Sequence, residues 1–260
     1  MLPVELVESA TRAAFERYGS ALLQYGEPQG FAPFLKASET LLNARGVECD
    51  ENQTFVSTGG SGGLNNIAMA ILEPGRTVLV ERPTYTPAMA VFRGYGANVV
   101  EVDTDQDGLR PEALADKSVR YPGAVLYVLP TFQNPTGRTM PADRRADIAE
   151  VIRRFGTLAI EDDVYADLRF RGEPVRSLYS HAPDNVVYLT SMSKTVAPAL
   201  RLGIATMPPK LLDAVLRLKP GIDMQTSTLP RRSVPRSSAR AGSPTMWRGS
   251  SRRMAPNSAC

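Results

Sequence analysis

The sequence predicts an α/β fold in which a mostly parallel β-sheet is covered by helices on both faces. Short runs of β-branched and other apolar residues recur along the chain and are expected to form strands, at residues 55–58, 77–80, 98–102, 124–129, 158–160, 186–189 and 202–206. Most segments between them space their apolar residues as a helix does, for example at 64–72 and 148–155. Strands that alternate with helices are typical of a parallel sheet buried on both faces.

At 260 residues with 43% hydrophobic content, the chain is long enough for one large domain. We expect a helical segment over 1–45, a large domain over 46–229 and a separate tail over 230–260. No run approaches the roughly 20 apolar residues of a membrane helix, and the first residues lack a signal-peptide pattern, so we expect a cytoplasmic protein without a membrane partner. Cys49 and Cys260 are too few for a disulfide framework and have no metal-ligand spacing.

The tail differs in composition from the rest of the chain. It contains no Asp, Glu or Lys but seven arginines; subtracting these from the formal net charge of +3 leaves residues 1–229 at −4. The basic balance of the whole chain therefore gives no argument for a nucleic-acid partner. A tail so poor in apolar residues is expected to be disordered. It could bind an anionic partner or be a plain disordered tail, but its abrupt onset favours an out-of-frame translation.

Ligands of parallel α/β sheets bind outside the carboxyl ends of the strands, and five predicted strand ends carry polar or reactive residues. In chain order these segments are STGGSGGL (57–64), ERPTY (81–85), PTFQNPTG (130–137), EDDVY (161–165) and TSMSKTVAPALRLG (190–203). Each has an ordinary explanation when taken alone: a glycine turn, a β-turn, helix-capping aspartates, a core tyrosine, or a solvated lysine or arginine. Glycines before a helix also let backbone N–H groups approach a phosphate.

Together the five segments supply the groups that pyridoxal 5′-phosphate requires. This cofactor needs a lysine amine for a Schiff base, a carboxylate that keeps its ring nitrogen protonated, and donors for its phosphate. It also needs a hydrogen-bond partner for its ring hydroxyl and an aromatic or apolar face for its ring. We therefore expect pyridoxal phosphate as the cofactor, bound where these strand ends meet.

The same segments resemble the motifs of the fold-type I pyridoxal-phosphate enzymes of aminotransferase class I/II, over about residues 22–230. SMSKTVAPALRLG is similar to the family's Ser-x-Ser-Lys…Arg-x-Gly signature, and NPTG, DDVY and GGSGG are similar to its other motifs. The resemblance implies that 46–229 form the three-layer, pyridoxal-phosphate-binding large domain of that fold type. It also implies that most of the family's small C-terminal domain is missing from this sequence.

The resemblance implies a role for each matching residue. Lys194 would be the Schiff-base lysine, Asp162 would pair with the ring nitrogen, and Tyr85 would stack on the ring. Tyr165 and Asn134 would bind the ring hydroxyl. Ser193 would also be a cofactor-binding residue. The remaining residues would hold the phosphate: Gly60, Ser61, Gly62, Ser191, Arg201 and, reaching into the second subunit of a homodimer, Tyr25.

The implied activity is transfer of an amino group from an amino acid to a 2-oxo acid. Lys194, once the substrate has displaced it, would be the general base at the substrate Cα, with Asp162 and Tyr165 as the other catalytic residues. YADLRFRGEPVRSL is most similar to the branch of 2-aminoadipate and aromatic aminotransferases and MocR regulators. Three alternatives stay open: the ligand-sensing domain of a MocR-type regulator, a pyridoxal-phosphate-dependent lyase or decarboxylase, and an inactive fragment of a frameshifted gene. No arginine for the substrate carboxylate is identified, and His181 is expected to be a surface residue.

Overall fold

A seven-stranded sheet lies at the centre of the molecule. The structure, a computed structural model, describes residues 2–227, so the tail predicted over 230–260 lies outside the described residues. The strand order is β1-β9-β8-β7-β6-β2-β3, and the strands are β1 (Thr54–Thr58), β2 (Thr77–Glu81), β3 (Asn98–Val102), β6 (Val125–Val128), β7 (Leu158–Asp162), β8 (Val186–Ser191) and β9 (Leu202–Thr206). All seven predicted strands are confirmed, and their ends differ from the expected ones by at most two residues.

One strand, β9, runs against the direction of the other six. β2 pairs in parallel with β3 and β6, β6 with β7, and β7 with β8, whereas β9 pairs antiparallel with both β8 and β1. The prediction of a mostly parallel sheet is therefore confirmed. A separate ribbon of β4 (Thr104–Asp105) and β5 (Gly108–Leu109) was not expected, because two-residue strands leave no pattern in a sequence.

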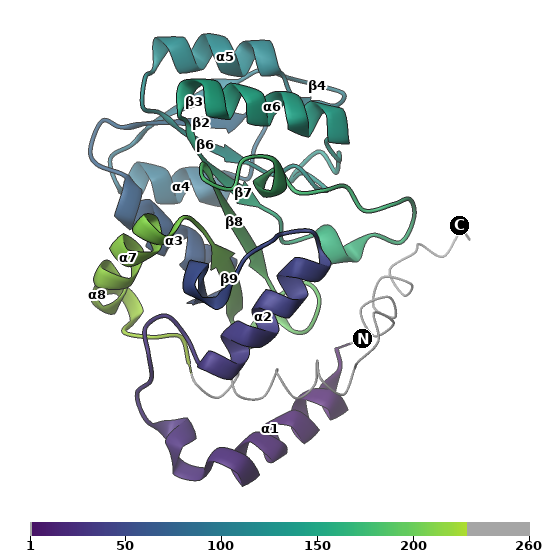
Figure 1. Cartoon of the computed structure of the whole chain (residues 1–260), viewed down its shortest axis with the longest axis vertical. Helices are drawn as coiled ribbons and strands as arrows, with labels where there is room; N and C mark the ends of the chain where they lie inside the picture. Colours follow the sequence, from purple (N-terminus) through teal and green to yellow (C-terminus); the bar gives the residue numbers. More distant parts are fainter. Residues whose placement is uncertain (1, 228–260) are drawn as a thin grey trace.

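Helices cover both faces of the sheet, which gives three layers (Figure 1). One face packs against α3 (Gly59–Ile71), α4 (Thr86–Gly94) and α7 (Pro209–Leu218). The other packs against α2 (Ala32–Ala44), α5 (Pro111–Arg120) and α6 (Ala142–Phe155). The segment predicted to be helical contains α1 (Val4–Tyr18) and α2, and α8 (Pro220–Asp223) follows α7. Short 3₁₀ helices span Gly19–Leu23, Glu51–Gln53, Ala166–Leu168, Tyr179–His181 and Pro198–Leu200.

Side chains of β6 and β7 alternate between the two faces of the sheet. Tyr127 and Ile160 lie in the core beneath α3 and α4, while Val128 and Ala159 lie in the core beneath α5 and α6. Because the alternation continues to the end of β7, neighbouring residues of the acidic run 161–163 point to opposite faces. This placement decides which of the three carboxylates can reach the cavity described below.

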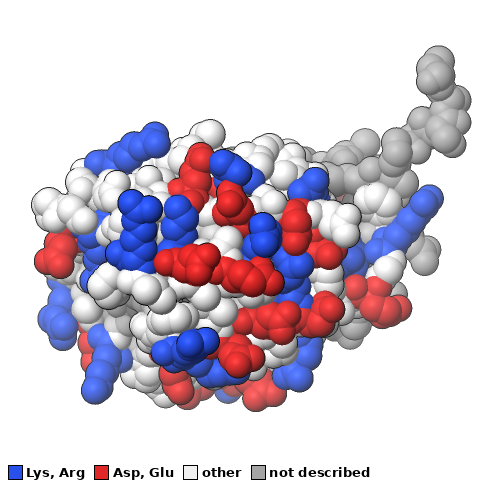
Figure 2. Space-filling model, turned by 90° about the horizontal axis from the view of Figure 1, so that it is seen from above, with Lys and Arg blue, Asp and Glu red and all other residues white. Residues whose placement is uncertain are grey.

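Charged side chains of both signs are interspersed on the face seen from above the view of Figure 1 (Figure 2). One ion pair of the described chain joins Arg144, at the start of α6, to Asp105 in β4, with nitrogen and oxygen 3.0 Å apart. Neither sign of charge dominates this face. Within residues 2–227, no helix combines the length and the apolar composition that crossing a membrane requires.

Candidate functional site

The five polar strand-end segments meet at one edge of the sheet, as expected from the common direction of β1, β2, β6, β7 and β8. They surround a cavity of about 270 Å³. Ten of the twelve predicted site residues line it: Gly60, Ser61, Tyr85, Asn134, Asp162, Tyr165, Ser191, Ser193, Lys194 and Arg201. Apolar side chains complete the wall, among them Leu64, Ala88, Leu129 and Val164. The cavity thus combines an apolar wall with a few polar groups, as small-molecule sites do.

Two predicted residues, Gly62 and Tyr25, are not part of the cavity wall. Gly62 lies further along α3, where a side-chain carbon would meet Thr58 at 3.3 Å. Tyr25 follows the first 3₁₀ helix and is 81% exposed. Within the described chain, Tyr25 therefore contributes nothing to this cavity.

Asp162 ends β7 and is buried at the cavity, and its two carboxylate oxygens have different surroundings. Oδ2 accepts a hydrogen bond from the Tyr127 hydroxyl at 2.7 Å. Oδ1 is buried and has no hydrogen-bond partner among the described residues. Burial raises the pKa of Asp162 to about 6; the hydrogen bond from Tyr127 opposes this rise, and the charge of Asp163 adds to it. An unpaired buried oxygen costs free energy unless a donor enters the cavity, so the residues fit a group that carries an N–H.

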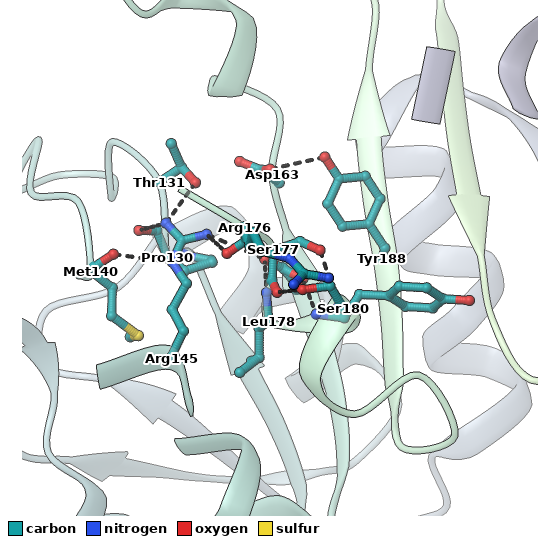
Figure 3. Close-up of polar contacts among 12 residues, drawn as sticks. Pro130, Thr131, Met140, Arg145, Asp163, Arg176, Ser177, Leu178, Ser180 and Tyr188 are labelled. Carbon is teal, nitrogen blue, oxygen red and sulfur yellow. Dashed lines mark hydrogen bonds and ion pairs between the residues drawn. The ribbon is translucent and has the colours of Figure 1, made fainter. Parts of the chain in front are cut away.

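The neighbouring carboxylates, Glu161 and Asp163, lie outside the cavity wall, although Oδ1 of Asp163 is also buried without a hydrogen-bond partner among the described residues. Glu161 accepts the backbone N–H groups of Leu178 at 2.9 Å and Tyr179 at 2.8 Å. Burial raises the pKa of Glu161 to about 7, and the charge of Asp163 adds to this rise. Asp163 accepts the Tyr188 hydroxyl at 2.9 Å, a contact drawn in Figure 3. Of the three acidic residues, only Asp162 lines the cavity.

A buried arginine on α6 fixes the loop that carries Asn134. The Arg145 side chain is fully buried and donates to the backbone oxygens of Met140 at 3.0 Å and Pro130 at 2.9 Å, the two ends of that loop. Figure 3 also shows its bonds to Thr131 and to the backbone oxygen of Arg176. The sequence analysis missed this residue. Its one signal is an arginine on the apolar spacing of the helix, three residues before Ile148.

The segment between β8 and β9 supplies the basic side of the cavity. Lys194 is exposed at the rim, with Nζ 5.9 Å from the centre of the Tyr165 ring. Ser191 Oγ accepts the backbone N–H of Ser193 at 3.1 Å, which holds the two hydroxyls side by side, 2.9 Å apart. The amine, the hydroxyls and the guanidinium of Arg201 therefore face the start of α3, whose backbone N–H groups favour an anion.

The backbone at Gly59 leaves space for the Arg201 guanidinium. A side-chain carbon at Gly59 would overlap that guanidinium, and Gly59 has a φ of +74°, which disfavours any other residue. Arg201 itself has a φ of 49°. Left-handed backbone in a residue with a side chain costs free energy and is enriched at functional sites. The site thus retains a strained residue that places a cation beside the N-terminus of α3.

Two titratable residues of the sequence analysis, His181 and Glu81, lie outside the cavity wall. The prediction that His181 is a surface residue is wrong in part, because it is half-buried and its Nε2 has no partner among the described residues. Burial lowers its pKa, and the charge of Arg176 lowers it further. Glu81, the first residue of ERPTY, is buried outside the cavity and accepts the Leu129 N–H at 2.9 Å. Neither residue lines the site.

The chain is similar in sequence to known aminotransferases. The family model for aminotransferase class I and II matches residues 2–232. Aromatic-amino-acid aminotransferase 1 of Thermococcus litoralis is 30% identical over 233 residues, which cover 87% of this chain and 56% of that protein. The uncharacterised HTH-type transcriptional regulator YdfD of Bacillus subtilis is 30% identical over 211 residues, which cover 80% of this chain and 43% of the regulator.

A solved structure has the same fold. The α-aminoadipate aminotransferase LysN of Thermus thermophilus, complexed with N-(5′-phosphopyridoxyl)-L-leucine, matches with a TM-score of 0.89 at 28% identity, over 96% of this chain and 64% of that one. The chain therefore spans less than two thirds of the length of each of these three proteins. Because the family model matches far more than half of the sequence, the chain belongs to the class I and II aminotransferase family.

Proposed function

We propose that the cavity binds pyridoxal 5′-phosphate and that the chain transfers an amino group from an amino acid to a 2-oxo acid. The observation that carries this proposal is the buried, unpartnered Oδ1 of Asp162 in a cavity that Lys194 also lines. A ring nitrogen that carries a proton would satisfy that oxygen, and an amine at the rim suits a cofactor with a carbonyl group. Membership of the aminotransferase family and the phosphopyridoxyl ligand of LysN support the same cofactor.

Each side chain has a task that suits its position. Asp162, when ionised, accepts the N–H of the ring nitrogen through Oδ1. The Lys194 amine would hold the cofactor covalently, and with an amino acid bound it would move the proton at the substrate Cα. The cofactor, when bound, supplies an electron sink for the charge that develops at that carbon. The phosphate is held by the N–H groups at the start of α3 together with Ser191, Ser193 and Arg201.

The remaining parts of the proposal concern the ring and the partners. Tyr85 packs against the ring, while Asn134 and Tyr165 bind its hydroxyl. Tyr25, which is exposed in the single chain, reaches the cofactor phosphate bound by the second copy of a homodimer. Gly62 supports the phosphate-binding start of α3 only through its backbone. The net acidic charge of residues 1–229 supports the expectation of a protein without a nucleic-acid partner. We also propose a cytoplasmic location.

Borohydride reduction tests the cofactor and its attachment together. The full chain, incubated with pyridoxal phosphate and reduced, should carry a pyridoxyl group on Lys194 after peptide mapping, and Lys194→Ala should carry none. A label on Lys210, or on Lys219, which is paired with Asp223 at 2.5 Å, would reject the assignment. In a separate sample that is not reduced, addition of an amino acid without a 2-oxo acid should convert the cofactor absorbance from the aldehyde form to the amine form.

The similarity to YdfD favours a second candidate function, a ligand-sensing domain that binds the cofactor without turnover. Both functions predict the label on Lys194. They differ in the product, because only an aminotransferase releases a 2-oxo acid from the amino donor and regenerates the aldehyde form. A screen of amino donors by mass spectrometry separates the two.

A further inference from the structure

The Tyr127 side chain lies behind the cavity wall, in contact with Asp162. It is fully buried on β6 and packs edge-on against Phe92 of α4, with the ring centres 5.3 Å apart. Tyr127 pairs in register with Ile160 of β7, so its ring reaches diagonally along the sheet to Asp162, two residues further on. The 2.7 Å distance from its hydroxyl to Oδ2 is that of a strong hydrogen bond to a carboxylate.

This hydroxyl can act only as a donor to Asp162. Burial raises the pKa of Tyr127 well above its ordinary value, and the charge of Asp162 raises it further, so the phenol keeps its proton. The other titratable groups around Asp162 are Asp163, the residue after the end of β7, and three residues from the other walls of the cavity: Tyr85, Tyr165 and Lys194. Tyr127 is the one described residue that donates a hydrogen bond to the Asp162 side chain.

We propose that Tyr127 is a positioning residue for the cofactor: by holding Oδ2 of Asp162, it turns Oδ1 toward the cavity and keeps the carboxylate ionised for the ring N–H. The inference rests on the proposed function, because it assigns Tyr127 to the same site. A carboxylate with one oxygen anchored cannot rotate away when the ring enters. The ionised form is favoured because its hydrogen bond to Tyr127 opposes the effect of burial.

The chain contains a matched control for this bond. Tyr188 of β8 donates to Asp163 at 2.9 Å (Figure 3). Both tyrosines are buried. In both pairs a buried tyrosine hydroxyl donates to an aspartate, although Tyr188 also interacts with Arg45. Tyr188 and Asp163 lie outside the cavity wall. Tyr188→Phe therefore removes an equivalent hydroxyl and leaves the cavity intact, so any difference from Tyr127→Phe reports on the site and not on stability.

The experiment compares the full-length wild type, Tyr127→Phe and Tyr188→Phe in three measurements. Urea unfolding should show similar losses of stability for the two variants. In cofactor-free protein with ¹³C-labelled aspartate, the pH midpoint of Asp162 should rise by about one pH unit in Tyr127→Phe alone. The affinity for pyridoxal phosphate at pH 7, measured by fluorescence titration, should fall about tenfold in Tyr127→Phe and stay unchanged in Tyr188→Phe.

A double-mutant cycle shows whether Tyr127 acts through Asp162. In an Asp162→Asn background, Tyr127→Phe should change the cofactor affinity by less than about twofold. A full tenfold loss in that background, or equal losses for Tyr127→Phe and Tyr188→Phe, would overturn the inference. If Tyr127→Phe fails to fold, fluorotyrosine at position 127 replaces it. Its more acidic phenol donates a stronger hydrogen bond and should lower the pH midpoint of the Asp162 titration. An unchanged midpoint would count against the hydrogen bond between residue 127 and Asp162.

Failure of the proposed function would look different. If the wild type does not bind pyridoxal phosphate, the proposed function and the role of Tyr127 toward the cofactor are both rejected. The Asp162 midpoint in the cofactor-free protein still decides whether Tyr127 keeps that carboxylate ionised. If the wild type binds and only the Tyr127 comparison fails, the proposed function stands without this inference.

Discussion

Replacing Glu81 with glutamine should stabilise the protein at alkaline pH. The Glu81 side chain is 2% exposed and accepts a single backbone N–H, from Leu129 at 2.9 Å, and no described residue forms a salt bridge with it. Burial raises its pKa from 4.5 to about 8, against the opposing hydrogen bonds from Leu129 and Gln133. The folded chain therefore favours the neutral form of this carboxyl.

The sign of the effect follows from the protons bound by each state. Between pH 4.5 and about 8, the folded chain keeps a proton on Glu81 that the unfolded chain has released, so the free energy of unfolding falls as the pH rises. At about 1.4 kcal/mol per pH unit, the whole interval corresponds to at most about 5 kcal/mol. A loss of even half that size is a large part of the 5–15 kcal/mol, roughly, that stabilises a domain.

Urea unfolding at pH 5 and pH 9 measures this contribution. Glutamine keeps an oxygen for the Leu129 N–H but cannot ionise, so Glu81→Gln should lose about 2–5 kcal/mol less stability than the wild type between the two pH values. Glu161 and Asp162, whose pKa values are also raised by burial, titrate in both proteins and cancel in the comparison. Equal pH dependence in the two proteins would refute the argument.

Three further predictions follow from the site and its supports. Asp162→Asn should abolish amino-group transfer and leave some cofactor bound, as measured by absorbance, while Asp163→Asn does less harm; the reverse order would contradict the assignment of Asp162. Arg145→Met should lower the free energy of unfolding, measured with urea, by about 3–5 kcal/mol, because it leaves buried acceptors unpaired. The control Arg153→Met, at an exposed position of the same helix, should cost less than about 1 kcal/mol in the same assay. Similar costs for the two variants would contradict the role of Arg145 in fixing the loop. Gly59→Ala should weaken cofactor binding about tenfold by displacing the guanidinium beside it, and unchanged affinity in a titration would show that the close approach is dispensable.

The strands and the place of the site could be predicted because both depend on local patterns. A strand buried on both faces, such as β6 or β8, is a continuous run of apolar residues. Once the strands are parallel, their carboxyl ends must share an edge, so the segments that follow them must meet. Lys194 and Asp162 could therefore be placed together although 32 residues of sequence separate their numbers.

The supporting residues could not be found in this way, because their partners are distant and follow no motif. Tyr127 meets Asp162 across 35 positions of sequence, and in the sequence it is one more aromatic residue in an apolar strand. Arg145 departs from the apolar pattern of α6, which marks it as unusual but does not reveal the carbonyl oxygens that it binds. Tyr25, by contrast, is named from the family resemblance, and the single chain leaves it 81% exposed and away from the cavity.

The reversed direction of β9 bears on how the site forms during folding. Lys194 and Arg201 lie on one short connection between antiparallel neighbours, which costs little entropy to close. The proposed phosphate loop at the start of α3 follows β1, and β1 joins the sheet only by pairing with β9, so that Thr58 lies opposite Leu202. Closing that contact links segments separated by more than half of the described chain, and such non-local pairing is slow. Affinity for the cofactor phosphate therefore develops only after the two ends of the domain have joined, and cofactor binding in a refolding experiment would report completion of the sheet.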